Sequence, residues 1–171
     1  MTDTKSLNKI GVNPLFLRED ELRQGIELLF YAYRDFTGEP DAVLSQHDFG
    51  RAHHRAIYFI GRNRGMPIGN LLKILKITKQ SLSRVLTQLI ADGFVEQRAG
   101  TTDKRQRLLY LTQKGDDLER DLSALQCARL ARAYREAGAE AVEGFRKVLL
   151  GIVDAENQAA ALSPRGKDDD T

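Results

Sequence analysis

The stretch 77–111 constrains the fold more than any other part of the chain. Between Thr78 and Gly93 apolar residues recur at the spacing of one helix face, with Thr78 suited to the N-cap and Gly93 to the C-terminal cap. The next two segments, 94–98 and 107–111, predict strands joined by a polar loop. A helix followed directly by a hairpin with a basic tip is compatible with few folds.

Two amphipathic helices are predicted before this stretch. Apolar residues at helical spacing over 22–36 predict the first, and the glycine and proline within 38–40 are expected to end it. A second helix is predicted over 45–62, because Ser45 followed three residues later by Asp48 resembles a capping box.

Three further helices complete the expected pattern. A short helix over 68–75 leads through a tight turn into the helix that begins after Thr78. A long helix is predicted to be capped by Thr112 and broken by Gly138, and a last helix covers 142–153. The fold class predicted is therefore mainly α with a small β-hairpin wing.

Charge is distributed unevenly along the 171 residues. The range 62–107 holds ten basic and three acidic residues, a net charge of +7, whereas 115–160 holds six basic and nine acidic residues, a net charge of −3. The net charge of the whole chain, +2, conceals this division. An anionic partner is therefore expected at the middle of the chain.

Composition excludes several classes of protein. With 42% hydrophobic and 29% charged residues the chain is typical of a soluble globular protein. No apolar run approaches the roughly 18 to 20 residues that span a bilayer, and residues 1–13 lack the layout of a signal peptide, so no membrane contact and a cytoplasmic location are expected. Cys127 is the single cysteine, and with His47, His53 and His54 it forms no spaced ligand cluster, so neither a metal nor a cofactor is expected.

The polar face of the helix after Thr78 carries side chains that can bind DNA. Arginine and lysine can pair with guanine, glutamine can bind adenine, and hydroxyls can contact bases or phosphates. Lys79 and Gln80 are the main predicted base readers, because the N-terminal part of a recognition helix lies deepest in the groove. An ordinary solvated helix face is the alternative, which the adjacent hairpin disfavours. The DNA contacts predicted on this helix are Thr78, Lys79, Gln80, Ser81, Ser83, Arg84 and Gln88.

The loop between the two strands concentrates positive charge where a protruding wing could reach a minor groove, whose negative potential favours arginine. Two roles stay open for Asp103: its carboxylate could orient the guanidinium of Arg105, or it could stabilise the turn. The DNA contacts predicted here are Arg98, Thr101, Thr102, Asp103, Lys104, Arg105 and Arg107.

Helix, short helix, tight turn, helix and basic hairpin are in order the parts of a winged helix-turn-helix, whose second motif helix enters the major groove of double-stranded DNA. An enzyme is disfavoured, because no Ser/His/Asp spacing, glycine-rich phosphate loop or paired acidic site is present. A protein-interaction module with the same fold, binding an acidic partner through its basic face, is the remaining alternative.

Three segments, 77–95, 103–105 and 109–115, together resemble the MarR family of regulators. The resemblance covers nearly the whole chain, from about 15 to 162. The run 53–62, with the beginning of the first segment, is similar to the PetP-type subgroup of that family.

This resemblance implies a homodimer that grips a pseudo-palindromic operator. It implies dimerisation helices over 15–44 and 113–162 and a winged helix-turn-helix DNA-binding domain over 45–112, between a flexible N-terminus at 1–14 and a disordered tail at 163–171. It also makes Arg105 the minor-groove arginine of the wing and Asp103 its orienting partner. Independently, the terminal helices carry more apolar surface than one small domain can cover.

Family resemblance further implies release from DNA by a small aromatic or phenolic effector in a cleft beside the dimerisation helices. Ordinary core packing is the alternative for the aromatic residues. The position of Cys127 in the long helix disfavours redox sensing and favours a buried small residue at a helix interface. The residues that could line the cleft are Phe30, Tyr33, Phe36, His53, His54 and Tyr58.

Overall fold

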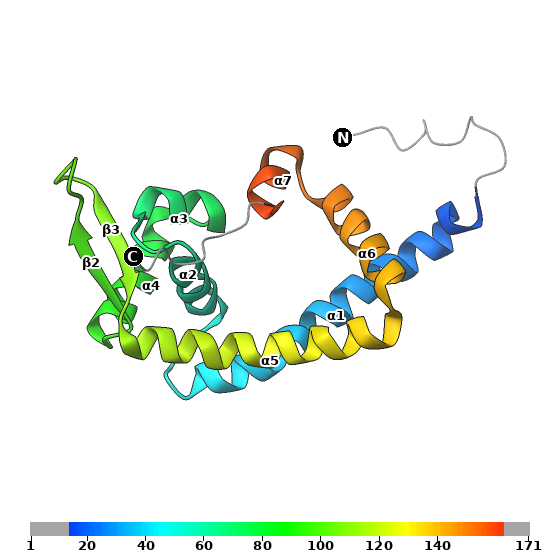
Figure 1. Ribbon diagram of the computed structural model, residues 1–171, viewed down its shortest axis with the longest axis horizontal. Helices are drawn as coiled ribbons and strands as arrows, with labels where there is room; N and C mark the ends of the chain where they lie inside the picture. Colours follow the sequence, from blue (N-terminus) through cyan, green and yellow to red (C-terminus); the bar gives the residue numbers. More distant parts are fainter. Residues whose placement is uncertain (1–13, 163–171) are drawn as a thin grey trace. The chain divides into compact units, whose positions relative to one another are not determined.

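The computed structural model describes residues 14–162 (Figure 1). These residues fall into two units, a first unit of 14–38 and a second unit of 39–162. Within 14–162 the chain is mainly helical with one small sheet, which confirms the predicted fold class. The predicted flexible start and disordered tail lie outside these residues, except for Pro14. In chain order the elements are a 3-10 helix (Leu15–Leu17), α1 (Glu19–Ser45), α2 (Arg51–Arg62), β1 (Met66–Pro67), α3 (Ile68–Leu75), α4 (Lys79–Ala91), β2 (Val95–Ala99), β3 (Arg107–Leu111), α5 (Gln113–Ala137), α6 (Ala139–Ile152) and α7 (Ala155–Leu162).

The first helix is longer than its sequence predicts. The expected end at 38–40 is wrong, because α1 continues through Pro40 to Ser45. Proline removes one amide donor from a helix but does not end it when later residues are held in place by packing. Here Leu44, in the last turn of α1, is completely buried in the core of the second unit.

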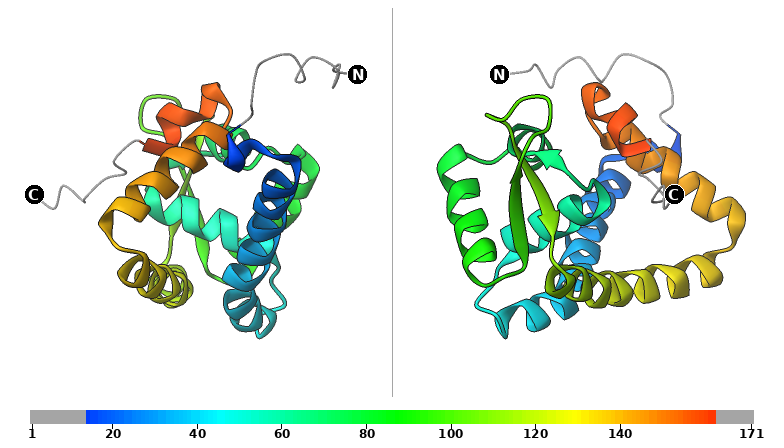
Figure 2. Two further views of the ribbon diagram at one scale, coloured as in Figure 1. Left: turned by 90° about the vertical axis from the view of Figure 1, so that its right-hand side faces the viewer. Right: turned by 60° about the vertical axis from the view of Figure 1, so that its left-hand side comes forward.

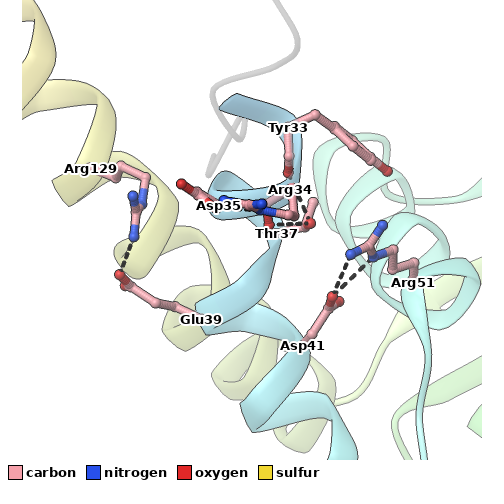
Figure 3. Close-up of polar contacts among 8 residues, drawn as sticks. All are labelled: Tyr33, Arg34, Asp35, Thr37, Glu39, Asp41, Arg51 and Arg129. Atoms are coloured by element: carbon pink, nitrogen blue, oxygen red, sulfur yellow. Dashed lines mark hydrogen bonds and ion pairs between the residues drawn. The ribbon is translucent and has the colours of Figure 1, made fainter. Parts of the chain in front are cut away.

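Two ion pairs hold the C-terminal part of α1 within the second unit (Figure 3). Asp41 accepts a hydrogen bond from Arg51 at the start of α2, at 2.9 Å, and Glu39 accepts one from Arg129 of α5, at 2.5 Å. Both pairs are partly exposed, so each contributes little to the free energy of unfolding. Each nevertheless limits how the end of α1 lies against α2 or α5.

The second helix starts later than predicted. The capping box at Ser45 and Asp48 is wrong, since Ser45 ends α1 and Asp48 takes a left-handed backbone with φ of 57°. The N-cap of α2 is Gly50, whose amide donates to Nδ1 of His53 at 3.1 Å. The N-cap amide is therefore that of Gly50, bonded by a histidine ring, and not that of Ser45, which a carboxylate was expected to bond. The predicted end of this helix at residue 62 is confirmed.

The sheet has three antiparallel strands in the order β1-β3-β2. The predicted hairpin is confirmed as β2 and β3, which pair from Val95 with Leu111 to Ala99 with Arg107. Sequence analysis missed β1, a strand of two residues that pairs Met66 with Leu109. In Figure 1 the loop between β2 and β3 projects beyond the helices.

One hydrophobic core joins the helices of the second unit to this sheet. Leu89 of α4, Leu109 of β3 and Leu122 of α5 are completely buried in it, and residues from α2 and α3 complete it. Figure 2 shows α2, α3 and α4 gathered beside the strands. This packing fixes α4 with one face inward, which decides which side chains it presents to solvent.

The predicted starts and ends of the C-terminal helices are confirmed only in part. Thr112 caps α5 by accepting the amide of Gly115 at 3.1 Å, and Gly138 ends it with φ of 83°, as predicted. The predicted last helix corresponds to α6, but a further helix, α7, was missed. No helix within 14–162 is long and apolar enough to cross a membrane.

Candidate nucleic-acid interface

Helix α4 presents a continuous polar face to solvent. Its buried face carries Leu82, Val85, Leu86 and Leu89, as the apolar periodicity predicts. The opposite face exposes Lys79, Gln80, Ser81, Ser83, Arg84 and Thr87. Cationic and amide side chains at adjacent turns can contact both phosphates and base edges.

The first turn of α4 is held by its own hydroxyl groups. Thr78 Oγ1 accepts the amide of Ser81 at 3.1 Å, which confirms the predicted N-cap, and donates to Ser81 Oγ at 2.9 Å. Both hydroxyls are therefore engaged in the structure of the helix end. Lys79 and Gln80, which follow the cap directly, remain exposed.

Gln88 is the member of the predicted set that faces the protein. It is half-buried, its Oε1 lies 2.8 Å from Nε2 of His53, and its Nε2 donates to the carbonyl oxygen of Asp48 at 3.4 Å. Sequence spacing places it on the polar face, but spacing could not reveal a partner from α2.

The tip of the hairpin is closed by its own main chain. The amide of Gly100 donates to the carbonyl of Gln106 and that of Gln106 to the carbonyl of Asp103, both at 3.0 Å. A Cβ at Gly100 would lie 2.6 Å from the Asp103 carbonyl oxygen, so the turn requires glycine. Within this tip Thr101, Thr102, Lys104 and Arg105 are exposed, as is Arg107 at the start of β3.

Asp103 takes the turn-stabilising role of the two that sequence left open. Its Oδ1 accepts the main-chain amide of Arg105 at 2.9 Å. The bond fixes the backbone from which the Arg105 side chain extends, rather than the guanidinium itself. An aspartate that bonds an amide two residues later is a common way to stabilise a turn.

Arg98 lies at the base of the wing and is held by two neighbours. It forms an ion pair with Glu96, and its guanidinium lies over the ring of Tyr110, 4.3 Å from the centroid. Neither partner was identified from sequence: Glu96 lies two residues earlier on the same strand, and the contact with Tyr110 depends on the register of β2 and β3. The side chain is nevertheless mostly exposed.

Helix α4 and strand β2 contribute to one surface. A hollow of about 350 Å³ has apolar residues of α3 and α4 in its floor, and its polar lining includes Lys79, Ser83 and Thr87 of α4 with Gln97 of β2. Polar residues of α4 and of strand β2 therefore border the same hollow.

The residues predicted to line an effector cleft are divided between the two units. Phe30, Tyr33 and Phe36 belong to the first unit, and His53, His54 and Tyr58 to the second. The cleft stays a prediction.

Two histidines of the second unit are shielded from water. Burial is the main cause that lowers the pKa of His54, and the negative charges of Asp41 and Glu119 act in the opposite direction. Burial likewise lowers the pKa of His53, which also stacks on Phe49 with ring centroids 4.8 Å apart. Both are therefore neutral imidazoles at neutral pH.

Cys127 lies on α5 and is exposed within the single chain. The expected burial at a helix interface is therefore not found among residues 14–162 of a single chain. Among residues 14–162 no cluster of side chains is arranged to hold a metal ion.

Known proteins are similar to this chain in sequence and in architecture. A family model described as MarR family matches residues 47–106. The HTH-type transcriptional regulator PetP of Rhodobacter capsulatus is 56% identical over 144 residues, which cover 84% of this chain and 87% of the relative. The chain belongs to the MarR family. It is therefore a MarR-type transcription regulator, and the alternative of an enzyme is excluded, because this family consists of regulators.

Solved structures of MarR proteins have the same winged helix fold. Streptococcus pneumoniae FabT in complex with DNA aligns with a TM-score of 0.69 at 19% identity, covering 77% of this chain and 94% of that one. A mutant MarR from E. coli complexed with operator DNA aligns with a TM-score of 0.61 at 22% identity, covering 83% of this chain and all of that one. These similarities confirm the winged helix-turn-helix architecture.

Proposed function

We propose that this MarR-family regulator binds duplex DNA as a homodimer, with α4 in the major groove and the loop between β2 and β3 at the neighbouring minor groove. The observation that carries the proposal is the exposed polar and basic face of α4, on a helix whose apolar face is buried, together with the exposed basic side chains of the wing loop. The structures of FabT and of the mutant E. coli MarR, both in complex with DNA, support it.

The exposed side chains suggest separate roles at the two grooves. Lys79 and Gln80 stand at the N-terminal end of α4, the part that lies deepest in a major groove, and are proposed to read base edges. Arg84 is proposed to contact phosphate. Arg105 extends from a turn that Asp103 fixes and is proposed to enter the minor groove.

A homodimer accounts for the apolar surface that the single chain leaves exposed. In the first unit Phe16, Ile26 and Phe30 are each more than 60% exposed, and in the second Val148 and Leu162 are equally exposed. Large apolar side chains exposed in this number within each unit favour an interface in a soluble protein. Twofold symmetry would place two α4 helices about 34 to 36 Å apart, one turn of DNA, on a pseudo-palindromic site.

The test is a titration of labelled duplex with purified protein, followed by fluorescence anisotropy. A site enriched from random duplexes is compared with a scrambled duplex at several salt concentrations. DNA binding requires log K to fall linearly with log salt, by about 0.9 per phosphate neutralised. Absence of duplex binding at low salt would contradict the proposal and favour the protein-interaction module.

Two alanine variants test which residues form the DNA-binding surface. Arg105→Ala should weaken binding to the enriched site, and Gln80→Ala should change base preference more than binding to the scrambled duplex. Arg120→Ala is the matched control, because Arg120 is an exposed arginine on α5 that pairs with Asp117 and lies outside the proposed surface. Equal binding by all three variants and the parent protein would contradict the assignment.

A small aromatic or phenolic effector that releases the DNA belongs to the same proposal. Its support is the exposure of the aromatic residues Phe30 and Tyr33 on α1. Titration of the protein–DNA complex with benzoate and phenol checks it, and a set of such compounds that leaves anisotropy unchanged contradicts it.

A regulator acting on the bacterial chromosome works in the cytoplasm, the location we propose.

A further inference from the structure

His53 joins the start of α2 to the recognition helix α4. Both of its ring nitrogens have partners: Nδ1 lies 3.1 Å from the amide nitrogen of Gly50, and Nε2 lies 2.8 Å from Oε1 of Gln88. The ring also stacks on Phe49, with an angle of 9° between the ring planes. A side chain held on three sides has little freedom to rotate.

The hydrogen-bond roles follow from one fixed donor. The amide of Gly50 can only donate, so Nδ1 of His53 must accept and therefore carries no proton. In the neutral ring the proton then sits on Nε2, which donates to Oε1 of Gln88. The amide group of Gln88 is thereby oriented with its Nε2 toward the carbonyl oxygen of Asp48, at 3.4 Å. The neutral form of His53 is the only one that satisfies all three bonds.

We propose that His53 is a positioning residue for DNA recognition, which holds Gln88 against α2 and so fixes the orientation of α4 on the domain. The inference rests on the proposed function, since orientation of α4 matters only if α4 reads DNA. It changes the role of Gln88, which acts as an internal anchor for the C-terminal half of α4. Base reading then belongs to the N-terminal half, where Lys79 and Gln80 are exposed.

The surroundings of His53 favour the neutral ring. Burial lowers the pKa of His53, while its bond to Gln88 and the charge of Asp92 at the end of α4 raise it by less. Two other ionisable side chains contact this aromatic cluster: His47 packs on Phe49, and Lys114 lies over the ring of Phe94, which itself packs on Phe49. Protonation would place a second N–H on Nδ1, directly against the amide of Gly50, and would break the cap of α2.

The test is a double-mutant cycle on DNA binding by the full chain. His53→Phe retains a ring that can stack on Phe49 but removes both hydrogen bonds, and Gln88→Met removes the same contact from the α4 side. Affinities for the enriched site and for a scrambled duplex are measured by anisotropy at constant ionic strength. His47→Phe is the matched control, since it makes the same chemical change in the same aromatic cluster away from Gln88.

If His53 acts through Gln88, each single variant should lose about two- to tenfold in affinity for the enriched site, the range expected for one hydrogen bond. The double variant should lose no more than either single variant, because the two residues form one unit. Binding to scrambled duplex should change less, since phosphate contacts depend less on the orientation of α4.

A pH profile separates positioning from general structural damage. Binding by the parent protein should weaken as pH falls below the ordinary histidine value of about 6.5, and this dependence should be smaller in His53→Phe. The His47→Phe control should bind like the parent and keep the parent's profile.

The outcomes distinguish this inference from the proposed function. If the parent and the control bind the enriched site but His53→Phe binds equally well, the positioning role is wrong and the proposed function stands. If Gln88→Met weakens binding only at one base pair while His53→Phe has no effect, Gln88 reads that base directly and the inference is overturned. If the parent itself does not bind duplex, the proposed function fails and the inference with it.

Discussion

Gly115 in the first turn of α5 offers a sharp test of how closely α5 packs against the end of α4. A Cβ added at Gly115 would lie 2.1 Å from the carbonyl oxygen of Phe94, and 3.1 Å from its carbonyl carbon. These are main-chain atoms, so no side-chain rotation can relieve the contact. The replacement Gly115→Ala must open the gap by about 0.9 Å merely to reach 3.0 Å, a distance that real Cβ atoms hardly ever go below.

The Phe94 carbonyl has little room to move. Its oxygen accepts the amide of Thr112 at 3.1 Å, and the Phe94 ring is buried against Phe49 and covered by Lys114. Overpacking of this kind costs about 1 to 3 kcal/mol. The gain in helix propensity on replacing glycine by alanine, at most about 1 kcal/mol, offsets only part of it. We expect a net loss of about 1 to 2 kcal/mol in the free energy of unfolding.

Urea denaturation followed by far-UV circular dichroism measures this change. Gly144→Ala is the matched control, because Gly144 lies inside α6 and a Cβ there would meet nothing within 4 Å. That variant should gain about 0.5 to 1 kcal/mol, so the same substitution has opposite signs at two helical glycines. Equal stability of Gly115→Ala and the parent protein would show that the described contact between α5 and Phe94 is wrong.

Three further predictions concern the core, the wing and pH. Leu89→Ala should lower the free energy of unfolding by about 2 to 5 kcal/mol in urea melts, because Leu89 is completely buried, and a loss below 1 kcal/mol would contradict its place in the core. Asp103→Ala should weaken operator binding in anisotropy titrations by less than Arg105→Ala does, because it removes the bond that fixes the turn and leaves the cation. Since burial lowers the pKa values of His53 and His54, the unfolded chain takes up protons first, and stability should be full above about pH 6.5 and fall below it. Identical urea midpoints at pH 7.5 and 5.5 would count against neutral, buried rings.

Elements that were predicted correctly from sequence carry both a periodic apolar face and a clear cap. Helix α4 has four buried residues at helical spacing and Thr78 at its start, and α5 begins at Thr112 and ends at Gly138. In these elements local preference and burial agree, so spacing alone sufficed.

Errors occurred where packing overrode a local signal. Pro40 predicts the end of a helix, but burial of Leu44 keeps α1 continuous to Ser45. The short strand β1 has too few residues for any pattern, and it exists because Met66 pairs with Leu109 of a strand more than forty residues later. Such pairings depend on the assembled fold rather than on neighbouring residues.

In the candidate site, too, some features follow from local sequence and others depend on the assembled fold. Exposure of Lys79 and Gln80 followed from the helical period, because the opposite face had to be buried. The contacts of Gln88 with His53 and of Arg98 with Tyr110 join separate elements, and no spacing rule predicts them. The role of Asp103 was one of two left open, and the amide of Arg105 decided it.

The self-closed turn at the end of the wing has an energetic consequence for association. Because Gly100, Asp103 and Gln106 already bond one another, the main chain beneath Arg105 is ordered before any partner arrives. Ordering a flexible loop on contact would cost roughly 1 to 2 kcal/mol for each residue fixed. A loop that already has its bound conformation avoids most of that entropic penalty. Its affinity for a partner can then be changed by side-chain substitutions alone.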